Sequence, residues 1–172
     1  MQIGATESGS QVVIAGVSVD VETEASAVRR VLGALDQGLG GLMVTVNVDH
    51  LRRCRIDERY AGLVSRAEIV VADGMPLVWA SRVRGRSLPE RVAGANLVWS
   101  MCEAAAARGR RVFLLGGDPG TAEAAKGVLE TRYPGIRVCG TQSPERGFEN
   151  DAGVLERLEA SVADSRPEIV LI

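Results

Sequence analysis

The chain has 172 residues, 46% hydrophobic and 24% charged, which is the size and composition of one soluble globular domain. A formal net charge of −2 and only two each of Phe, Tyr and Trp disfavour a nucleic-acid-binding protein. No apolar run approaches the roughly 18 residues of a membrane-spanning helix, and three cysteines without CxxC spacing argue against a disulfide framework.

The first part of the chain predicts strands and helices in alternation. Residues 1–11 have neither the basic nor the apolar region of a signal peptide, and we expect a short flexible leader. The β-branched run 12–19 predicts a strand that bends at Gly16. Apolar residues at helical spacing predict a helix over residues 23–38, and the nearly continuous apolar run 42–48 predicts a buried strand.

The alternation continues to the end of the chain. Helices are expected after Asp49, which can cap the first of them, after Gly120, and over residues 57–65, 75–83, 95–108 and 151–163. Strands are expected over residues 67–72, 111–115, 136–139 and 167–172. Such βα units predict a single α/β domain over residues 12–172, with a mostly parallel sheet and helices on both faces. Because the last residues resemble a buried strand, we expect a fragment truncated at its C-terminus.

Polar side chains follow two of the predicted strands where each one ends. Thr45 and Asn47 lie on the same side of one strand, and Asp73 ends the next. The carboxyl ends of parallel strands meet at one edge of a sheet, so the three could converge on one ligand. They could equally be helix caps, while a carboxylate at that edge also suits a general base.

A second candidate site is the loop Gly116-Gly117-Asp118-Pro119-Gly120, which joins a strand to a helix. Asp118 can cap that helix and Pro119 can take its first position. The glycines allow close approach of the backbone, so amides at the helix N-terminus could hold a phosphate. The loop matches neither GxGxxG nor a Walker motif, and a plain tight turn is an equal alternative.

Four arginines lie close together in the sequence and form the one basic cluster of the chain: Arg82, Arg84, Arg86 and Arg91. Such a run is usually solvated, but it could also bind a diphosphate or an anionic membrane surface. Arg91 stands apart, because the segment 89–94 has the composition of a rigid loop that presents one guanidinium. His50 is the only histidine, which makes a metal site there improbable, and no DxD pattern offers a ligand for a diphosphate-bound metal.

Several separated motifs together resemble one protein family. They are Thr45-x-Asn47, Ala72-Asp73-Gly74-Met75-Pro76, Leu88-Pro89-Glu90-Arg91-Val92-x-Gly94, Val112-Phe113-Leu114-Leu115-Gly116-Gly117-x-Pro119-Gly120, Tyr133-Pro134-Gly135 and Pro167-x-Ile169-Val170. Their order and spacing over residues 12–172 are similar to the WecG/TagA/CpsF glycosyltransferases of bacterial cell-surface polysaccharide synthesis. The resemblance implies a Rossmann-like sheet and metal-independent chemistry, with no cofactor.

The resemblance also implies a reaction and its partners. An inverting N-acetylhexosaminyltransferase would move a sugar, often of the N-acetylmannosamine type, from a UDP-sugar to N-acetylglucosamine on undecaprenyl diphosphate, in polysaccharide or teichoic acid synthesis. The protein would be cytoplasmic and peripheral at the inner face of the cell membrane, docked through the family's C-terminal region. That region and the loop before it are expected to be missing here. Self-association into a homo-oligomer is left open.

Residue roles follow from the same resemblance. Asp73 would be the general base, Thr45 and Asn47 would position substrate, and Arg91 would meet the donor diphosphate. The loop residues Gly116, Gly117, Pro119 and Gly120 would contact the nucleotide-sugar. One alternative is a non-catalytic nucleotide-sugar-binding or scaffold subunit that retains the fold. A nicotinamide-dependent oxidoreductase is disfavoured because GxGxxG is absent after the first strand.

Overall fold

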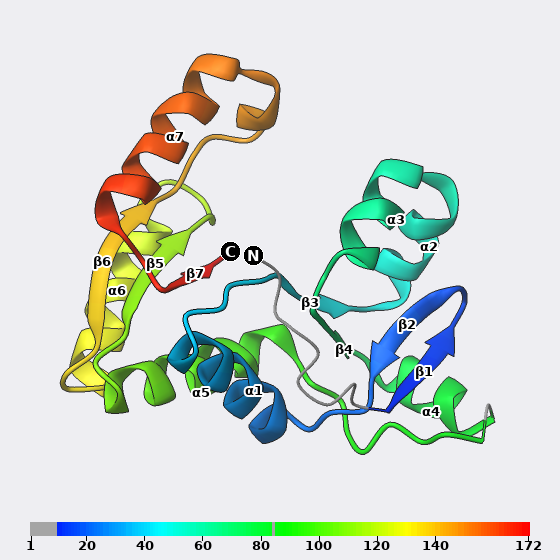
Figure 1. Ribbon diagram of the computed structural model, residues 1–172. Helices are drawn as coiled ribbons and strands as arrows, with labels where there is room; N and C mark the ends of the chain where they lie inside the picture. Colours follow the sequence, from blue (N-terminus) through cyan, green and yellow to red (C-terminus); the bar gives the residue numbers. More distant parts are fainter. Residues whose placement is uncertain (1–9, 84) are drawn as a thin grey trace. The chain divides into compact units, whose positions relative to one another are not determined.

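The computed structural model describes residues 10–83 and 85–172 (Figure 1). Its strands are β1 (Gln11–Ile14), β2 (Val17–Asp20), β3 (Met43–Val46), β4 (Ile69–Ala72), β5 (Arg111–Leu115), β6 (Arg137–Gln142) and β7 (Ile169–Leu171). Its helices are α1 (Glu24–Asp36), α2 (Val48–Ile56), α3 (Glu58–Ser65), α4 (Met75–Val83), α5 (Gly94–Ala107), α6 (Thr121–Arg132), the 3₁₀ helix η1 (Phe148–Asn150) and α7 (Ala152–Ser165). Contacts divide the chain into two compact units, Met1–Ser100 and Met101–Ile172. The predicted α/β fold with parallel strand pairing is confirmed.

The first predicted strand is in fact two. β1 and β2 form an antiparallel hairpin, with Val12 opposite Val19 and Ile14 opposite Val17. The two residues between them, Ala15 and Gly16, both have positive φ, as a type I′ turn requires. Alternating β-branched residues could not distinguish one bent strand from two short ones, because the pattern has the same period on both sides of a two-residue turn.

The predicted leader and basic run fall partly outside the described residues. Residues 1–9 lie outside them, and so does Arg84. The expected boundary at residue 11 is wrong, because Gln11 already belongs to β1 and pairs with Asp20.

The first unit is built on the parallel pair β3–β4. Thr45 lies opposite Val71 and Val46 opposite Ala72 in this register, so the two strands end side by side. β4 is buried along its whole length, as expected of a strand covered on both faces. The chain between the two strands forms α2 and α3.

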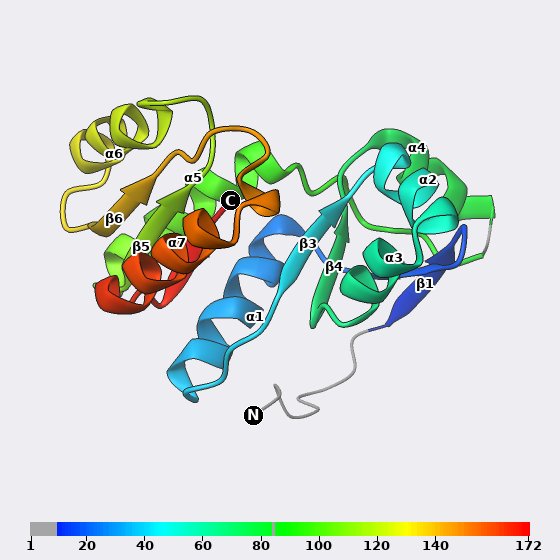
Figure 2. The same ribbon diagram turned by 90° about the horizontal axis from the view of Figure 1, so that it is seen from above.

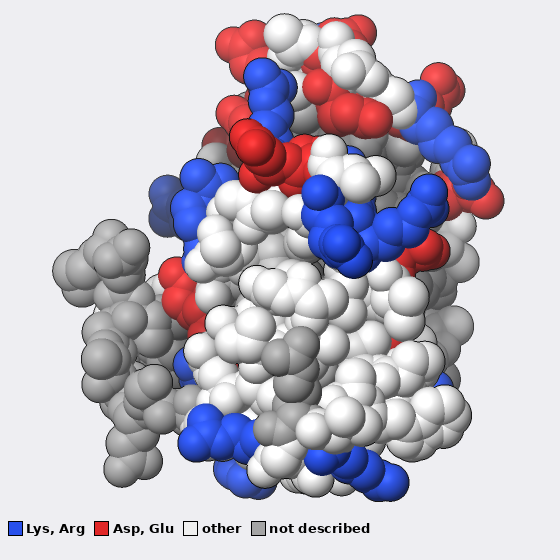
Figure 3. All heavy atoms as spheres, turned by 90° about the vertical axis from the view of Figure 1, so that its right-hand side faces the viewer, with Lys and Arg blue, Asp and Glu red and all other residues white. Residues whose placement is uncertain are grey.

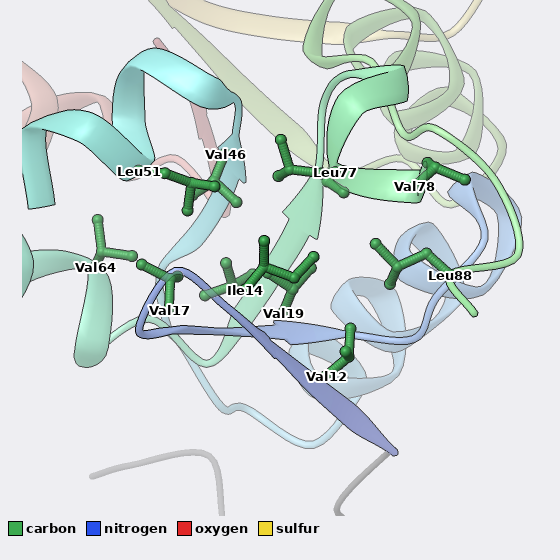
Figure 4. Close-up of a cluster of buried hydrophobic side chains, with 12 residues drawn as sticks. Val12, Ile14, Val17, Val19, Val46, Leu51, Val64, Leu77, Val78 and Leu88 are labelled. Carbon is green, nitrogen blue, oxygen red and sulfur yellow. The ribbon is translucent and has the colours of Figure 1, made fainter. Parts of the chain in front are cut away.

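An apolar core fills this unit between the hairpin, the parallel pair and the helices α2, α3 and α4 (Figure 4). Twelve buried side chains form it: Val12, Ile14, Val17, Val19, Val46, Leu51, Val64, Val70, Ala72, Leu77, Val78 and Leu88. Fully burying a side chain of this kind contributes roughly 1.5–3 kcal/mol. The core therefore holds the ends of β3 and β4, and the helices that start there, in one rigid frame.

The second unit is a three-stranded parallel sheet in the order β6-β5-β7. The chain passes from the central strand β5 to β6 on one side of it, and then crosses to β7 on the other side of β5. Right-handed crossovers therefore require α6 and α7 to cover opposite faces, and Figure 2 shows them there. Phe113, in the central strand, is fully buried between them.

Candidate active site

Asn47 follows β3 and begins α2 as its N-cap. Its side-chain oxygen accepts from the amide of His50 at 3.1 Å, while Nδ1 of His50 accepts from the amide of Asn47 at 3.2 Å. This reciprocal capping box corrects the expectation that Asp49 caps the helix. His50 therefore has a structural role in this helix start, and its ring also stacks on Tyr60 with 6.1 Å between centroids.

Asp73 follows β4 at the same edge of the sheet. Its amide donates to the carbonyl of Val46 at 2.8 Å, which extends the β3–β4 ladder by one bond. Its carboxylate oxygen Oδ2 accepts from the amide of Gly94 at 3.3 Å. Among the described residues, Oδ1 has no hydrogen-bond partner. Asp73 thus sits at the N-terminus of α5, where the helix dipole favours a carboxylate, and keeps one oxygen available.

Thr45 meets the same glycine from β3. A Cβ built on Gly94 would lie 3.1 Å from Oγ1 of Thr45, closer than nearly all real contacts. A side chain at position 94 would therefore push the threonine hydroxyl aside. Gly94 thus lies against both Thr45 and Asp73, although the two residues come from different strands.

The loop that carries Arg91 is anchored on both sides of that residue. Before it, Oε1 of Glu90 accepts from the amide of Glu24 at the start of α1, at 2.7 Å. After it, Val92 is buried and its amide donates to the carbonyl of Ala72 at 2.8 Å. Arg91 itself is exposed and has no ion pair or hydrogen bond within the described part of the chain. The loop therefore presents a single free guanidinium next to the end of β4.

The glycine loop of the second unit is a tight connection held by Ser143. The Ser143 hydroxyl donates to the carbonyl of Gly116 at 3.0 Å and accepts from the amide of Ala122, in the first turn of α6, at 3.3 Å. A Cβ on Gly117 would lie 2.8 Å from Cβ of Thr121, so only glycine fits there.

The start of α6 differs from the prediction for this loop. α6 begins at Thr121 with Gly120 as N-cap, so Asp118 and Pro119 are not its cap and first residue. Gly117, Pro119 and Gly120 are exposed, and Gly116 is half-buried. The loop forms a tight turn. Contact between this loop and a nucleotide-sugar stays a prediction.

Two polar residues that the sequence did not single out join separate segments by hydrogen bonds: Asp20 in the first unit and Ser143 in the second. Asp20 is 2% exposed and accepts from the amide of Val70 at 2.8 Å, from Gln11 at 3.1 Å and from Arg30 at 3.3 Å. It joins the hairpin to β4 and to α1. An aspartate that ends a β-branched run was a signal that could have identified it, whereas nothing in the sequence around Ser143 indicates its role.

The thiol of Cys102 is buried, and that burial raises its pKa to about 11. Cys102 is thus a packing residue of the core. Asp57 caps α3, and the hydrogen bond from the amide of Tyr60 lowers the pKa of its carboxyl group.

Two surface hollows of the first unit lie away from these residues. One lies between α2 and α3, and another lies between the hairpin and α3; neither is lined by Thr45, Asp73 or Arg91. The chemistry of the strand ends, rather than concavity, identifies the candidate site. Residues 10–83 and 85–172 contain no group of three or more His, Cys, Asp and Glu side chains suited to a metal ion. No described helix is long and apolar enough to cross a membrane.

The chain is similar in sequence to several named bacterial transferases. An N-acetylglucosaminyldiphosphoundecaprenol N-acetyl-beta-D-mannosaminyltransferase of Bacillus spizizenii is 27% identical over 138 residues, which cover 80% of this chain and 51% of that protein. Its Bacillus subtilis namesake is 23% identical over 138 residues, or 80% and 52% of the two chains. The Staphylococcus aureus namesake is 33% identical over 94 residues, or 55% and 37%.

The chain spans about half the length of the Bacillus relatives that it matches. The profile of the Glycosyl transferase WecG/TagA/CpsF family matches residues 12–172, nearly the whole chain. That match includes both strand ends of the candidate site, the arginine loop and the glycine loop. The resemblance found in the separate motifs is thereby confirmed, and the chain belongs to the WecG/TagA/CpsF glycosyl transferase family.

Proposed function

We propose that this chain carries the catalytic site of an inverting transferase that moves a sugar of the N-acetylmannosamine type from a UDP-sugar to N-acetylglucosamine on undecaprenyl diphosphate. The activity for which the relatives are named supports the choice of sugar and acceptor. The observation that carries the proposal is the convergence of Thr45 and Asp73 on Gly94, at the end of the loop that holds the anchored Arg91.

In this proposal Asp73 is the general base. Its Oδ2 is held by the amide of Gly94, which orients the carboxylate, and its Oδ1 faces no other described partner. Oδ1 takes the proton of the acceptor hydroxyl as that oxygen attacks the anomeric carbon of the donor. A positioned base of this kind contributes typically 10²- to 10⁴-fold to a rate.

Thr45 and Asn47 have different roles in this proposal. Thr45 has a hydroxyl next to Gly94 and positions substrate directly. The side-chain oxygen of Asn47 is engaged in capping α2, so Asn47 contributes through its remaining amide donors and by fixing the start of that helix.

Arg91 compensates the charge that develops on the departing UDP. A guanidinium matches a diphosphate with two parallel hydrogen bonds, and anchoring of the loop at Glu90 and Val92 limits the entropy lost when it binds. Catalysis without a metal follows from the same idea, since fixed positive groups take over the role of the cation. The glycine loop Gly116–Gly120 is proposed to contact the nucleotide-sugar through its backbone.

The membrane position follows from the acceptor. Because that acceptor is a lipid, the protein is proposed to work at the inner face of the cell membrane as a peripheral protein. The family's C-terminal region is the proposed anchor.

The decisive experiment is a panel of UDP-sugars with a lipid-diphosphate-linked N-acetylglucosamine analogue, followed by release of UDP. Transfer is expected with UDP-N-acetylmannosamine and not with its gluco epimer. Binding of UDP-sugars without transfer, measured by calorimetry on the same protein, would instead favour a nucleotide-sugar-binding subunit. Absence of both binding and transfer would favour a scaffold.

A further inference from the structure

One face of α4 exposes a row of large apolar side chains. Met75, Trp79 and Val83 are spaced four residues apart, so they lie above one another on the same side of the helix. Their exposed fractions are 40%, 56% and 90%. The opposite side of α4 buries Leu77 and Val78 in the core of the first unit, so the apolar row is not required for packing.

The described charged residues at the C-terminal end of this row are arginines. Arg82 is exposed in the last turn of α4, and Arg86 is exposed in the loop that follows, where its guanidinium donates to the carbonyl of Gln11 at 2.9 Å. The one charged residue of the hairpin strands, Asp20, is buried.

Figure 3 shows the side of the molecule that carries the hairpin and α4. The lower half of this side is mostly uncharged, with Lys and Arg groups along its lower edge. An apolar surface bordered by basic groups, with a tryptophan among its apolar residues, matches the interface of an anionic bilayer. It does not match an acidic or purely polar partner.

We propose that the Met75–Trp79–Val83 face of α4, flanked by Arg82 and Arg86, is a surface that docks on anionic lipid headgroups. α4 begins two residues after Asp73, so the docked face starts beside the candidate base. This inference rests on the proposed function in one respect: a lipid-linked acceptor must reach Asp73 from the bilayer.

A second exposed apolar residue of the first unit provides the matched comparison. Ile56 ends α2 as Val83 ends α4, and it is 76% exposed. The residues around it are of both signs, with Arg52 and Arg53 next to Asp57 and Glu58. Surrounding charges of mixed sign do not favour binding to an anionic membrane. Substitution of Ile56 should therefore leave lipid binding unchanged.

The first test is sedimentation of the 172-residue protein with vesicles of phosphatidylcholine alone or with about one third phosphatidylglycerol. Binding is expected only to the anionic vesicles. The double variant Trp79→Ser, Val83→Ser and the single variant Arg82→Glu should each weaken binding by about tenfold or more. Ile56→Ser and Arg55→Glu are the matched controls and should bind like the parent.

The second test reads Trp79 directly. Trp99→Phe leaves Trp79 as the single tryptophan, and its emission should shift to shorter wavelength on anionic vesicles because the indole leaves water. An unchanged spectrum, or equal losses in the Ile56 and Trp79 variants, would overturn the proposal. It would also be overturned by dimerisation without lipid that the double variant abolishes, since the face would then bind a second copy.

The third test separates docking from catalysis. With a short-chain, water-soluble acceptor the double variant should transfer sugar like the parent, and it should lose activity only with acceptor embedded in vesicles. Anionic vesicle binding without any transfer would sink the proposed function and leave the docking surface intact. Transfer from vesicles that is unaffected by the double variant would sink the docking surface alone.

Discussion

The strand pairs β3–β4 and β5–β7 begin alike and end differently. A glutamate precedes the second strand of each pair. Glu68 donates its amide to the carbonyl of Leu42 at 2.9 Å and accepts from the amide of Leu42 through Oε2 at 2.6 Å. Glu168 makes the same two bonds with Arg111, at 2.9 and 3.0 Å. Each glutamate thus replaces a missing ladder residue and closes the amino end of its strand pair.

Arginines reinforce both amino ends. Arg30 donates to the carbonyl of Glu68 at 2.9 Å, and Arg110 forms an ion pair with the carboxylate of Glu168. The sequence shows the shared element as Glu-Ile-Val at residues 68–70 and 168–170.

The carboxyl ends are built differently. β4 ends in a carboxylate that holds the amide of Gly94 and keeps one oxygen free, whereas β5 ends in a glycine turn closed by the Ser143 hydroxyl. The amino ends of these strands are closed by hydrogen bonds, whereas the carboxyl ends carry the groups that we propose act on substrate, as in other parallel α/β sheets. Substitutions at the two kinds of end should therefore have different consequences.

The largest effect is expected at the free carboxylate. Asp73→Asn should lower the rate of sugar transfer by about 10²- to 10⁴-fold, because an amide cannot take the proton of the acceptor hydroxyl. The melting temperature should stay the same, since the side-chain oxygen of asparagine still accepts from the amide of Gly94. UDP release measures the rate. Asp49→Asn, at an exposed carboxylate of α2, is the control, and retained turnover in Asp73→Asn would refute the assignment of the base.

A smaller effect is expected at Gly94. Gly94→Ala should slow transfer by about tenfold, because displacing the Thr45 hydroxyl by a few tenths of an ångström misaligns the substrate. Gly33→Ala in α1 is the matched control: nothing lies within 4 Å of its added Cβ, and it should raise the free energy of unfolding by about 0.5–1 kcal/mol. Equal rates in the two variants would show that Thr45 does not position substrate.

The smallest effect is expected at an amino end and should appear in stability alone. The hydrogen bond from Arg110, and after it the amide of Arg111, lower the pKa of Glu168 below its ordinary value of 4.5. A carboxyl group with a lowered pKa in the folded state stabilises the protein above its unfolded pKa, and this stabilisation is lost as the pH falls through the folded pKa.

Glu168→Gln should therefore lower the free energy of unfolding at neutral pH by less than about 1 kcal/mol, because the pair is partly exposed. The difference from the parent should shrink as the pH falls below 4.5, and transfer by the folded protein should be unchanged. Chemical denaturation at neutral and acidic pH measures it. A difference that persists in acid would mean that the charge of Glu168 does not stabilise the strand pair.

The sequence predicted most elements because their signals are local. The helix expected over residues 75–83 has the bounds of α4, and the rule for parallel strands correctly placed the ends of β3 and β4 at one edge. The errors arose where local patterns are ambiguous. A hairpin and a bent strand share the same alternation, and either Asn47 or Asp49 could have capped α2.

The sequence by itself established the α/β fold, the polar groups at the strand ends and the resemblance to a glycosyltransferase family, since these depend on residue type and short-range order. It could not establish which atoms meet. The bond from Gly94 to Asp73 spans 21 residues and the bond from Ser143 to Gly116 spans 27. Such contacts exist only after strand register and loop packing have brought the segments together, so the free oxygen of Asp73 and the exposed guanidinium of Arg91 become visible only in the folded chain.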